Sequence, residues 1–388
     1  MKICSRRSNP ACARATAPIK WAALCVLLLS VAASIGAADD FLQVTGPCNL
    51  SFPGDHGPHI GFRTEWWYYT GNLTDADNHR YGFQLTFFRR QLAPTAAREQ
   101  WPAPASSWRT DQVYLAHAAV TDVDGGRHLQ AETMARPVLS MAGAEQEGTA
   151  WKVHVGTWQA TITESNHHLS AAGDGFALDL NLTPVKPVVR HGIEGYSQKG
   201  QSPERASCYY SFTRLEARGG LSIEGRHRAV NGSAWMDHEF STAPLEPGIS
   251  GWDWFSLQLT DQTEIMVFLL RQADGSLNPA TSGTVVLPSG ETRHLSAGDI
   301  DIRPLAHWTS PHSGARYPVK WAVAVPAMQA ELTVTASLDD QEMHTRRSTM
   351  VVYWEGSVRV SGSSGGKSVN GTGYAEMTGY AEPFDTDL

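Results

Sequence analysis

Hydrophobic and polar side chains alternate along much of the chain. Between residues 81 and 88, aromatic or leucine side chains occupy every second position, and glycine or polar residues lie between them. This period of two is typical of a strand with one buried face. The aromatic-rich run 65–73 precedes this segment, and the polar segment 75–79 between the two runs is typical of a turn. The two runs therefore predict a β-hairpin.

Similar short runs continue toward the C-terminus, and glycine, proline or aspartate usually separates them. No stretch shows a long apolar stripe with the 3.6-residue period of a helix. The pattern therefore predicts an all-β protein, either a sandwich or a barrel. The further strands that we expect cover residues 113–123, 151–155, 159–163, 176–182, 208–215, 221–224, 228–236, 252–260, 264–270, 283–287, 317–325, 330–337, 350–360 and 373–378.

The proline- and glycine-rich segment 243–248 interrupts this series of runs. Such segments often connect domains, and each half of the chain is long enough for a β-barrel of its own. We therefore expect an N-terminal domain over residues 39–243 and a C-terminal domain over residues 244–388. The segment 361–366, which is rich in serine and glycine, is expected to form the tip of a hairpin.

The first 38 residues have the layout of a secretory signal peptide. They carry five basic side chains and no acidic one, an apolar stretch begins at Trp21, and small residues lead to Ala38. The apolar stretch is shorter than the roughly 20 residues of a transmembrane helix. We expect cleavage after Ala38 and export to the periplasm or the exterior, with an uncleaved membrane anchor as the alternative.

Removal of this segment makes the protein more acidic and leaves two cysteines. The remainder has 26 basic and 39 acidic side chains, whereas the whole chain has a net charge of −8. Such an acidic protein repels phosphate backbones, so nucleic acid is not an expected partner. Cys48 and Cys208 remain, and in an oxidising compartment they could form a disulfide. Two separate buried thiols are the alternative, because the sequence does not give the distance between them.

Two motifs suggest a nucleophile or a metal site but lack the necessary context. Residues 362–366 match the Gly-x-Ser-x-Gly motif of hydrolases, which needs a strand before it and a helix after it. The segment lies instead in a polar loop between expected strands. His56 and His59 are separated by Gly-Pro, which prevents the helix that would direct both rings to one ion. We expect no metal ion, and no cofactor-binding motif is present.

Aromatic side chains are concentrated in two places. Residues 66–69 are all Trp or Tyr and direct two rings to each face of their strand, and three tryptophans form a second group around residues 235–254. Such rings either fill a core or line a cavity for a large apolar ligand. In the second interpretation, the ligand-binding residues are Trp66, Tyr68, Trp235, Trp252 and Trp254.

An Asp-His-Glu sequence follows Trp235 on the same expected strand. Alternation places Asp237 and Glu239 on the face of Trp235, and His238 on the opposite face. Burial among aromatic rings favours the neutral form of a carboxyl, which can then act as a general acid at neutral pH. Aromatic faces also stabilise cations. These residues indicate protonation of an alkene or ionisation of a tertiary alcohol, and a salt bridge at a domain boundary is the alternative.

Three blocks of the sequence resemble the AttH/CrtC family. Residues 52–71 contain Phe-Pro-Gly-Asp-His-Gly-Pro-His and Glu-Trp-Trp-Tyr-Tyr-Thr-Gly, and residues 231–240 read Asn-Gly-Ser-Ala-Trp-Met-Asp-His-Glu-Phe. Residues 371–380 read Gly-Thr-Gly-Tyr-Ala-Glu-Met-Thr-Gly-Tyr. The blocks occur in family order and span nearly the whole exported part. The resemblance implies two consecutive lipocalin-like antiparallel β-barrel domains with a ligand cavity.

The resemblance also implies a reaction. The family includes carotenoid 1,2-hydratases, which add water to a terminal isoprenoid double bond without an organic cofactor. Asp237 would be the acid, His238 would orient the water, and Glu65 on the opening strand is a second acid candidate. The leading hypothesis is therefore an exported, cofactor-free hydratase that acts on an apolar isoprenoid or lipid.

Two departures from the hydratases favour a second hypothesis. Phe240 stands where those enzymes more often have a Trp, and residues 264–271 lack their Tyr-x-Asp pair. Other members of the family are exported lipocalin-like proteins encoded beside transporter components. The alternative is a non-catalytic periplasmic protein that carries a hydrophobic small molecule for an ABC transporter.

Overall fold

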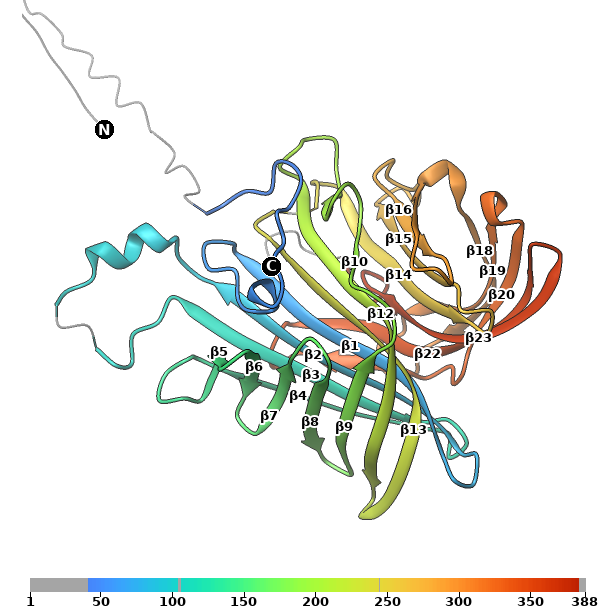
Figure 1. The fold of residues 1–388 in the computed structure, drawn as a ribbon, viewed down its shortest axis with the longest axis horizontal. Coiled ribbons are helices and arrows are strands. Elements are labelled where there is room, and N and C mark those ends of the chain that lie inside the picture. The colour runs from blue at the N-terminus through green and yellow to red at the C-terminus, as the bar shows by residue number, and fades with distance from the viewer. Residues whose placement is uncertain (1–40, 104–105, 244, 384–388) are drawn as a thin grey trace, which may run out of the picture. The chain divides into compact units, whose positions relative to one another are not determined.

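Antiparallel strands make up most of the structure (Figure 1). The computed structural model describes residues 41–383 apart from 104, 105 and 244, so the predicted signal peptide lies outside the described residues. The first sheet has 13 strands: β1 (Thr64–Asp75), β2 (Arg80–Gln91), β3 (Gln112–Asp122), β4 (Arg127–Ala135), β5 (Ala142–Glu147), β6 (Ala150–Val155), β7 (Trp158–Ile162), β8 (His167–Gly173), β9 (Phe176–Pro184), β10 (Val189–Arg190), β11 (Tyr196–Gln198), β12 (Ala206–Ile223) and β13 (Arg226–Ser241).

The second sheet has 10 strands and follows the first along the chain. They are β14 (Ile249–Leu259), β15 (Glu264–Gln272), β16 (Ser282–Val286), β17 (Thr292–Ser296), β18 (Asp301–Thr309), β19 (Arg316–Val325), β20 (Ala330–Ala336), β21 (Glu342–Thr345), β22 (Val351–Ser364) and β23 (Lys367–Met377). Four short 3-10 helices are η1 (Gly54–His56), η2 (Thr95–Gln100), η3 (Ala297–Asp299) and η4 (Pro326–Met328). Within the described part of the chain, no helix has the length and hydrophobicity needed to cross a membrane.

Both sheets are strongly curved. The order of the first is β4-β3-β2-β1-β13-β12-β9-β8-β7-β6-β5, with β10 and β11 paired to β12, and it forms a nearly closed barrel. The second has the order β17-β16-β15-β14-β23-β22-β20-β19-β18, with β21 paired to β22, and it forms a half-barrel. The predicted all-β, lipocalin-like architecture is confirmed, and the second barrel is less complete than the first.

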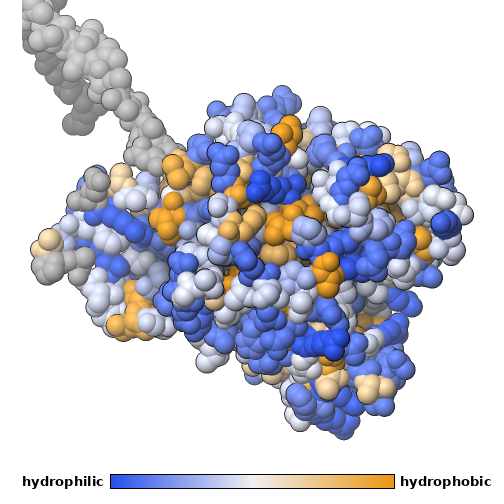
Figure 2. All heavy atoms as spheres, viewed as in Figure 1, coloured by the Kyte–Doolittle hydropathy of each residue, from blue (hydrophilic) through white to orange (hydrophobic). Residues whose placement is uncertain are grey.

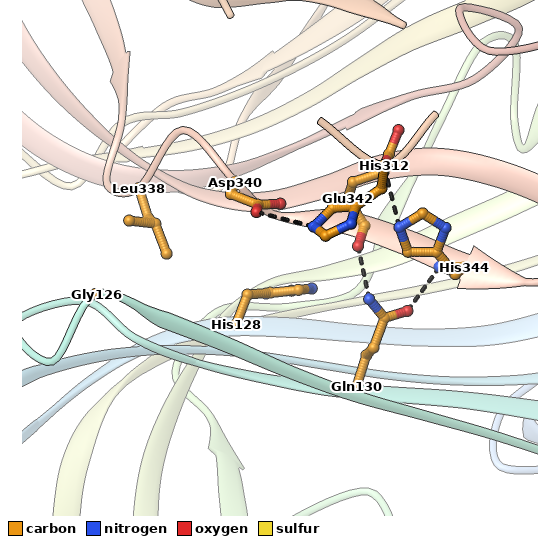
Figure 3. A pocket seen from close by; sticks show the side chains of 8 residues that line it. All are labelled: Gly126, His128, Gln130, His312, Leu338, Asp340, Glu342 and His344. Carbon is orange, nitrogen blue, oxygen red and sulfur yellow. Dashed lines mark hydrogen bonds and ion pairs between the residues drawn. The ribbon is translucent and has the colours of Figure 1, made fainter. Parts of the chain in front are cut away.

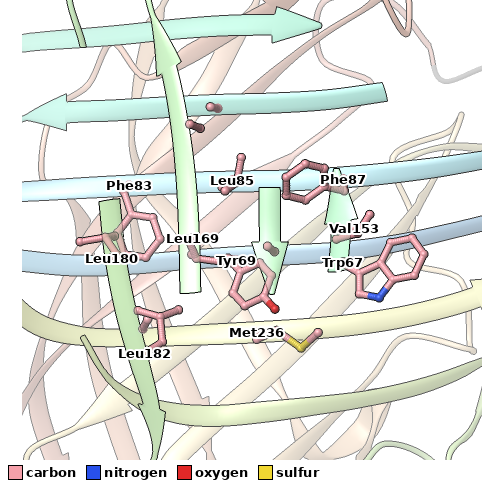
Figure 4. Packing of buried hydrophobic residues seen from close by; sticks show 14 of the residues in the cluster. Trp67, Tyr69, Phe83, Leu85, Phe87, Val153, Leu169, Leu180, Leu182 and Met236 are labelled. Carbon is pink, nitrogen blue, oxygen red and sulfur yellow. The ribbon is translucent and has the colours of Figure 1, made fainter. Parts of the chain in front are cut away.

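The predicted hairpin of β1 and β2 supplies part of the first barrel's interior. Trp67 pairs with Phe87 and Tyr69 with Leu85 across the two strands, and all four side chains are buried. Figure 4 shows these side chains with Met236 of β13 in one apolar cluster. Cross-strand pairs of large side chains stabilise a sheet and fix its register. The register of β1 therefore decides which aromatic residues face the barrel and which face outward.

The outward faces of β1 and β13 contact the second sheet. Tyr68 and Trp235 lie in one buried cluster with Trp254 of β14 and Tyr374 of β23. This cluster is separate from the interior of either barrel. The two sheets thus bury a third apolar layer between them. Residues 39–388 form one compact unit by their backbone contacts, and the division into domains at residues 243 and 244 stays a prediction.

Cys48 and Cys208 form a disulfide, with their Cα atoms 5.9 Å apart. Cys208 lies on β12, and Cys48 lies in the segment that precedes η1. The bond links positions 160 residues apart and therefore fastens the start of the described chain to the barrel wall.

Replacing both cysteines by serine should lower the free energy of unfolding by about 2–4 kcal/mol, the usual range for native disulfides. The open form of the denatured chain has more conformations, so the folded state is less favoured. Urea titrations without reductant would measure the difference. The wild type unfolded with reductant present should match the variant, and a double variant as stable as the oxidised wild type would contradict the expectation.

Candidate functional site

Asp237 and His238, the predicted acid and its water-orienting partner, lie on opposite faces of β13 because side chains alternate along a strand. Asp237 lies opposite Tyr68 and faces the second sheet, whereas His238 lies opposite Trp67 and faces the first barrel's interior. Both side chains are buried. The structure thus has two polar clusters on opposite sides of the same strands, and the proposed site residues are divided between them.

The first cluster, inside the barrel, is built around Glu65. Its Oε1 accepts hydrogen bonds from His59 Nδ1 at 2.7 Å and His238 Nε2 at 2.8 Å, and its Oε2 accepts one from Arg89 Nε at 2.8 Å. Burial alone would raise the pKa of Glu65, but the hydrogen bonds from both histidines hold it well below its ordinary value. Burial opposes the charge of His59 too, yet hydrogen bonds to Asp55 and Glu65 raise its pKa to about 9.

Hydrogen bonds extend this cluster toward η1. His238 Nδ1 and His56 Nδ1 each lie 2.8 Å from the hydroxyl of Tyr210. The same hydroxyl donates to the backbone carbonyl oxygen of Asp55 at 3.1 Å, so Tyr210 connects both histidines to η1. Burial lowers the pKa of His56 to about 4, which agrees with a neutral ring.

The same cluster contains a group of side chains that could hold a metal ion. His59, Glu65 and His238 each offer one atom within 4.8 Å of the others, and no other such group was found in the described part of the chain. Both oxygens of Glu65 already accept bonds from the two histidines and Arg89. The charge of Glu65 is balanced by His59 and Arg89. The three side chains can therefore serve as a structural ion-pair network.

The second cluster lies between the sheets and is built around Asp237. Its Oδ1 accepts hydrogen bonds from Trp235 Nε1 at 2.6 Å and from the hydroxyl of Ser211, and its Oδ2 accepts one from Tyr209 at 2.8 Å. Burial nevertheless raises the pKa of Asp237 to about 7. This carboxyl can therefore gain or lose a proton near neutral pH.

Two tryptophans of β14 connect Asp237 to a second carboxyl. Trp254 Nε1 donates to the hydroxyl oxygen of Tyr209 at 3.2 Å, and Trp252 Nε1 donates to Glu376 Oε2 at 3.2 Å. Trp254 also lies directly opposite Glu376 in the pairing of β14 with β23. Burial, assisted by the charge of Asp237, raises the pKa of Glu376 to about 7. Asp237 and Glu376 thus have similar proton affinities.

A third carboxyl, that of Glu355, lies between Glu376 and Tyr68. Glu355 of β22 lies opposite Glu376 of β23, and its Oε1 accepts a hydrogen bond from Tyr68 at 2.6 Å. Tyr68 in turn lies opposite Asp237. Burial and the neighbouring Glu376 raise the pKa of Glu355 well above its ordinary value. We call the following group the inter-sheet site: Tyr68, Tyr209, Asp237, Trp254, Glu355 and Glu376.

The expected carboxyl Glu239 has a different role from Asp237. Lys199 Nζ lies 3.2 Å from Glu239 Oε1, and Ser207 donates a hydrogen bond to the same oxygen. Lys199 also lies 3.8 Å from the ring centre of Phe268 and 5.0 Å from that of Tyr209. Glu239 is therefore paired with a buried cation, unlike Asp237, which accepts only hydrogen bonds from uncharged groups.

Exposure differs across the inter-sheet site. Asp237, Trp235 and Trp254 are buried, whereas Trp66, Trp252 and Glu376 are only partly buried. Glu376 is therefore more exposed as a residue than Asp237. On the face shown in Figure 2, hydrophobic side chains form small patches among hydrophilic ones, so this surface does not mark the site by itself.

Two surface pockets lie elsewhere. One, of about 240 Å³, lies between β4 and β21 and is lined by His128, His312, His344 and Glu342 among others (Figure 3). His312 Nε2 and His344 Nε2 each face a carboxylate, at 3.6 and 3.1 Å. The other, of about 470 Å³, is lined by residues such as Arg214. Neither is lined by Asp237, Glu355 or Glu376.

Comparison with known proteins identifies the family. The model of the AttH-like family matches residues 43–380. The chain belongs to the AttH-like family. A crystal structure of an AttH protein from Nitrosomonas europaea is 33% identical, with a TM-score of 0.76, and the match covers 88% of this chain and all of that one. No curated protein matches this chain.

More distant structures share the AttH-like fold. Kievitone hydratase from Nectria haematococca is 16% identical with a TM-score of 0.66, and the match covers 90% of this chain and all of that one. The protein CghA, solved with Sch210972, is 14% identical with a TM-score of 0.53, and the match covers 88% and 97% of the two chains.

The structure of this AttH-like protein brings together the five proposed ligand-binding residues and Asp237, because all of them contribute to the inter-sheet site or its apolar cluster. It places Glu65 and His238 on the other side of the sheet. The sequence interpretation missed Glu376, Glu355 and Tyr209. Glu376 lies in the third block that resembles the family, two residues after Tyr374, and this spacing was the available signal.

Proposed function

We propose that this protein is a cofactor-free acid–base enzyme of the hydratase type that acts on an apolar isoprenoid or lipid at the inter-sheet site. The observation that carries the proposal is the pair Asp237 and Glu376. Both have pKa values of about 7 and both lie beside tryptophans. Perturbed carboxyls of this kind are typical of general acids and bases.

The hydrogen bonds suggest different roles for the two carboxyls. Asp237 accepts three hydrogen bonds, which favour its ionised form, whereas Glu376 accepts one from Trp252. Glu376 would therefore donate the proton and Asp237 would receive one. In the sequence-based hypothesis Asp237 was the acid, whereas this proposal assigns that role to Glu376 and makes Asp237 the base.

The reaction needs only a proton and water. The carboxyl of Glu376 donates its proton to one carbon of the double bond, whose π electrons form the new C–H bond and leave a carbocation on the other carbon. Water attacks this carbon and loses a proton to the carboxylate of Asp237. Proton exchange between the carboxyls or with solvent restores both groups, and the sum is an alkene plus water giving an alcohol.

The aromatic residues provide the surroundings that such a cation needs. The rings of Trp235 and Trp254 lie 6.2 Å apart, and that of Tyr68 lies 5.1 Å from Trp254. A cation over an aromatic face gains about 1–2 kcal/mol when it is shielded from water. The structural similarity to kievitone hydratase, whose name denotes a hydratase, supports a reaction of this class.

The test is incubation of the purified protein with isoprenoids that carry a terminal trisubstituted double bond, in water enriched in ¹⁸O. A product whose mass has increased by one water, with the label in the new hydroxyl, supports hydration. If no probe gains water and extracted ligand is unchanged, the hydratase proposal fails.

A carrier is the second candidate. The face of β15 in the apolar cluster presents Met266, Phe268 and Leu270, so this strand offers apolar binding surface to a ligand. Native mass spectrometry of the protein from its own host would distinguish the two functions. An intact hydrophobic molecule that co-purifies, is never converted and passes to an ABC transporter would support carriage.

We also propose that the protein works outside the cytoplasm, after removal of residues 1–38. The disulfide between Cys48 and Cys208 supports this location, because such bonds persist in oxidising compartments. Fractionation of the host cells and N-terminal sequencing of the protein would test it.

The activity should have a narrow optimum near pH 7. Below this pH both Asp237 and Glu376 are protonated and the base is lost, and above it both are ionised and the acid is lost. Because the two carboxyls interact, the acidic and basic pKa values of a kcat/KM profile describe the pair and cannot be assigned to one residue each. A rate that is constant from pH 5 to pH 9 would contradict this expectation.

A further inference from the structure

One oxygen of Glu355 has no hydrogen-bond partner. The side chain is 1% exposed, its Oε1 accepts from Tyr68, and its Oε2 is unpaired among the described residues. A buried polar atom without a partner costs about 1–3 kcal/mol, so such atoms are rare and often meet a ligand.

The surroundings of Glu355 decide which kind of group Oε2 would meet. Its cross-strand neighbour is Glu376, and among the described residues no Lys or Arg forms an ion pair with either carboxyl. Two adjacent carboxyls without a compensating cation oppose each other's ionisation. Burial and Glu376 both raise the pKa of Glu355 well above its ordinary value, which favours the neutral form of this carboxyl.

The position of its proton follows from the bond to Tyr68. Oε1 is occupied as an acceptor of the Tyr68 hydroxyl. The proton of the neutral acid therefore lies on Oε2, which becomes a hydrogen-bond donor with no acceptor. An acceptor oxygen on a ligand is the group that would satisfy it.

We infer that Glu355 binds a carbonyl or hydroxyl oxygen of the substrate, so that the inter-sheet site takes oxygenated isoprenoids in preference to hydrocarbons. The inference rests on the proposed function only for the location of the ligand. Tyr68 lies opposite Asp237, and Glu355 lies opposite Glu376, so the recognised oxygen lies on the same face as the reacting carboxyls. Glu355 acts as a specificity residue and transfers no proton.

The experiment compares three C15 probes that differ in one group: farnesal, the hydrocarbon farnesene and farnesylamine. Dissociation constants would be measured through the quenching of tryptophan fluorescence at pH 7. Wild-type protein should bind farnesal about 10- to 100-fold more tightly than farnesene, which is the factor expected of one buried hydrogen bond. Binding is measured without turnover, so the result does not depend on whether hydration occurs.

Two variants test whether Glu355 causes the preference. Tyr68→Phe keeps the acid and should retain the preference for farnesal. Tyr68→Phe combined with Glu355→Leu removes both partners, which limits the loss of stability, and should reduce the preference to within about twofold. If the double variant does not fold by circular dichroism, Glu355→Leu alone replaces it, and its preference should also fall to within about twofold.

Three outcomes would overturn the inference. The first is equal affinity of the wild type for farnesal and farnesene, or binding of neither. The second is a preference for farnesal that survives in the Glu355 variants. The third is tightest binding of farnesylamine, because it would show that the carboxyls recognise a cation. Incorporation of ¹⁸O into an alcohol formed from the hydrocarbon probe, alongside any of these outcomes, would leave the proposed hydratase function intact.

Discussion

Replacement of Glu376 by Gln is expected to lower the rate of product formation by about 10²- to 10⁴-fold, the contribution typical of a positioned general acid. The amide keeps the size of the side chain and can still accept the hydrogen bond that Trp252 donates. It cannot donate a carboxylic proton. Asp237→Asn should lower the rate by a similar factor, because the amide cannot receive the proton of the attacking water. Rates would be measured by mass spectrometry with saturating probe.

The matched control is Asp253→Asn. Asp253 is also a buried carboxyl of β14 with a raised pKa, but it faces away from the inter-sheet site and pairs with Arg271 at 2.9 Å. This variant tests the general cost of altering a buried acid, and it should retain most of the activity. If Glu376→Gln and Asp253→Asn fold normally and lose activity equally, the assigned roles are wrong.

The pH profile provides a second check on these variants. In wild-type protein, titration of the pair Asp237 and Glu376 causes the loss of activity at both low and high pH. Glu376→Gln leaves one titrating carboxyl, so any residual activity should lose one side of the bell. An unchanged bell in the variant would assign the limits to other groups.

The fold was predictable where one face of a strand is buried. The hairpin of β1 and β2 has clear alternation and was found with nearly correct bounds. The expected runs 208–215 and 221–224 belong to the single long strand β12 (Ala206–Ile223). The strands β4, β5, β8, β10, β11, β17, β18 and β21 were not expected, and β4 and β18 show why. Their side chains are mostly half-buried or exposed on both faces, so burial imposes little alternation on their sequence.

The chemistry of the site was only partly predictable, because it depends on contacts between strands that are distant in sequence. Asp237 stood out because it follows Trp235 at a spacing of two. Glu376 and Glu355 lie more than 110 residues away and resemble ordinary exposed acids in a strand. The contact between the outer faces of the two sheets places Glu355 beside Tyr68, and the pairing of β14 with β23 places Glu376 beside Trp252.

Register also explains why Glu65 and Asp237 are apart. β1 and β13 pair with Tyr68 opposite Asp237, so Glu65, three residues earlier in β1, has the opposite orientation. The sequence shows that Glu65 and Trp67 share a face, but it does not show which face of β1 meets which face of β13. A shift of one residue would exchange the two clusters.

Replacement of Arg89 by Met should lower the free energy of unfolding by about 3–5 kcal/mol at pH 7. Arg89 and Glu65 are both fully buried, and their closest atoms lie 2.8 Å apart. Arg89 also donates to the carbonyl oxygens of His59 and Phe62. Methionine fills a similar volume but removes the guanidinium that donates to Glu65 Oε2. Urea titrations of both proteins would measure the loss.

The matched control is the exposed ion pair of Arg80 and Asp124, whose side chains are 43% and 32% exposed. Water screens such pairs, so Arg80→Met should cost no more than about 1 kcal/mol. If Arg80→Met and Arg89→Met lower the free energy of unfolding equally, burial of the Glu65 network adds nothing to the stability of the ion pair. A second variant separates charge from packing: Arg89→Met with Glu65→Gln should recover part of the loss, because it removes the uncompensated charge.

The loss caused by Arg89→Met should also depend on pH, and its sign follows from the pKa of Glu65. This pKa is lowered in the folded protein, so ionised Glu65 contributes stability above its ordinary value of 4.5, and that contribution is lost as the pH falls. His59, whose pKa is raised to about 9, contributes fully below its ordinary 6.5 and ceases to contribute as the pH rises through 9. The network is therefore most stabilising between pH 4.5 and 6.5.

In the variant, protonation of Glu65 at lower pH removes the unpaired charge, so the difference from wild type should shrink as the pH falls from 7 toward 4. A difference that grows over this range would mean that Glu65 is not the group Arg89 stabilises.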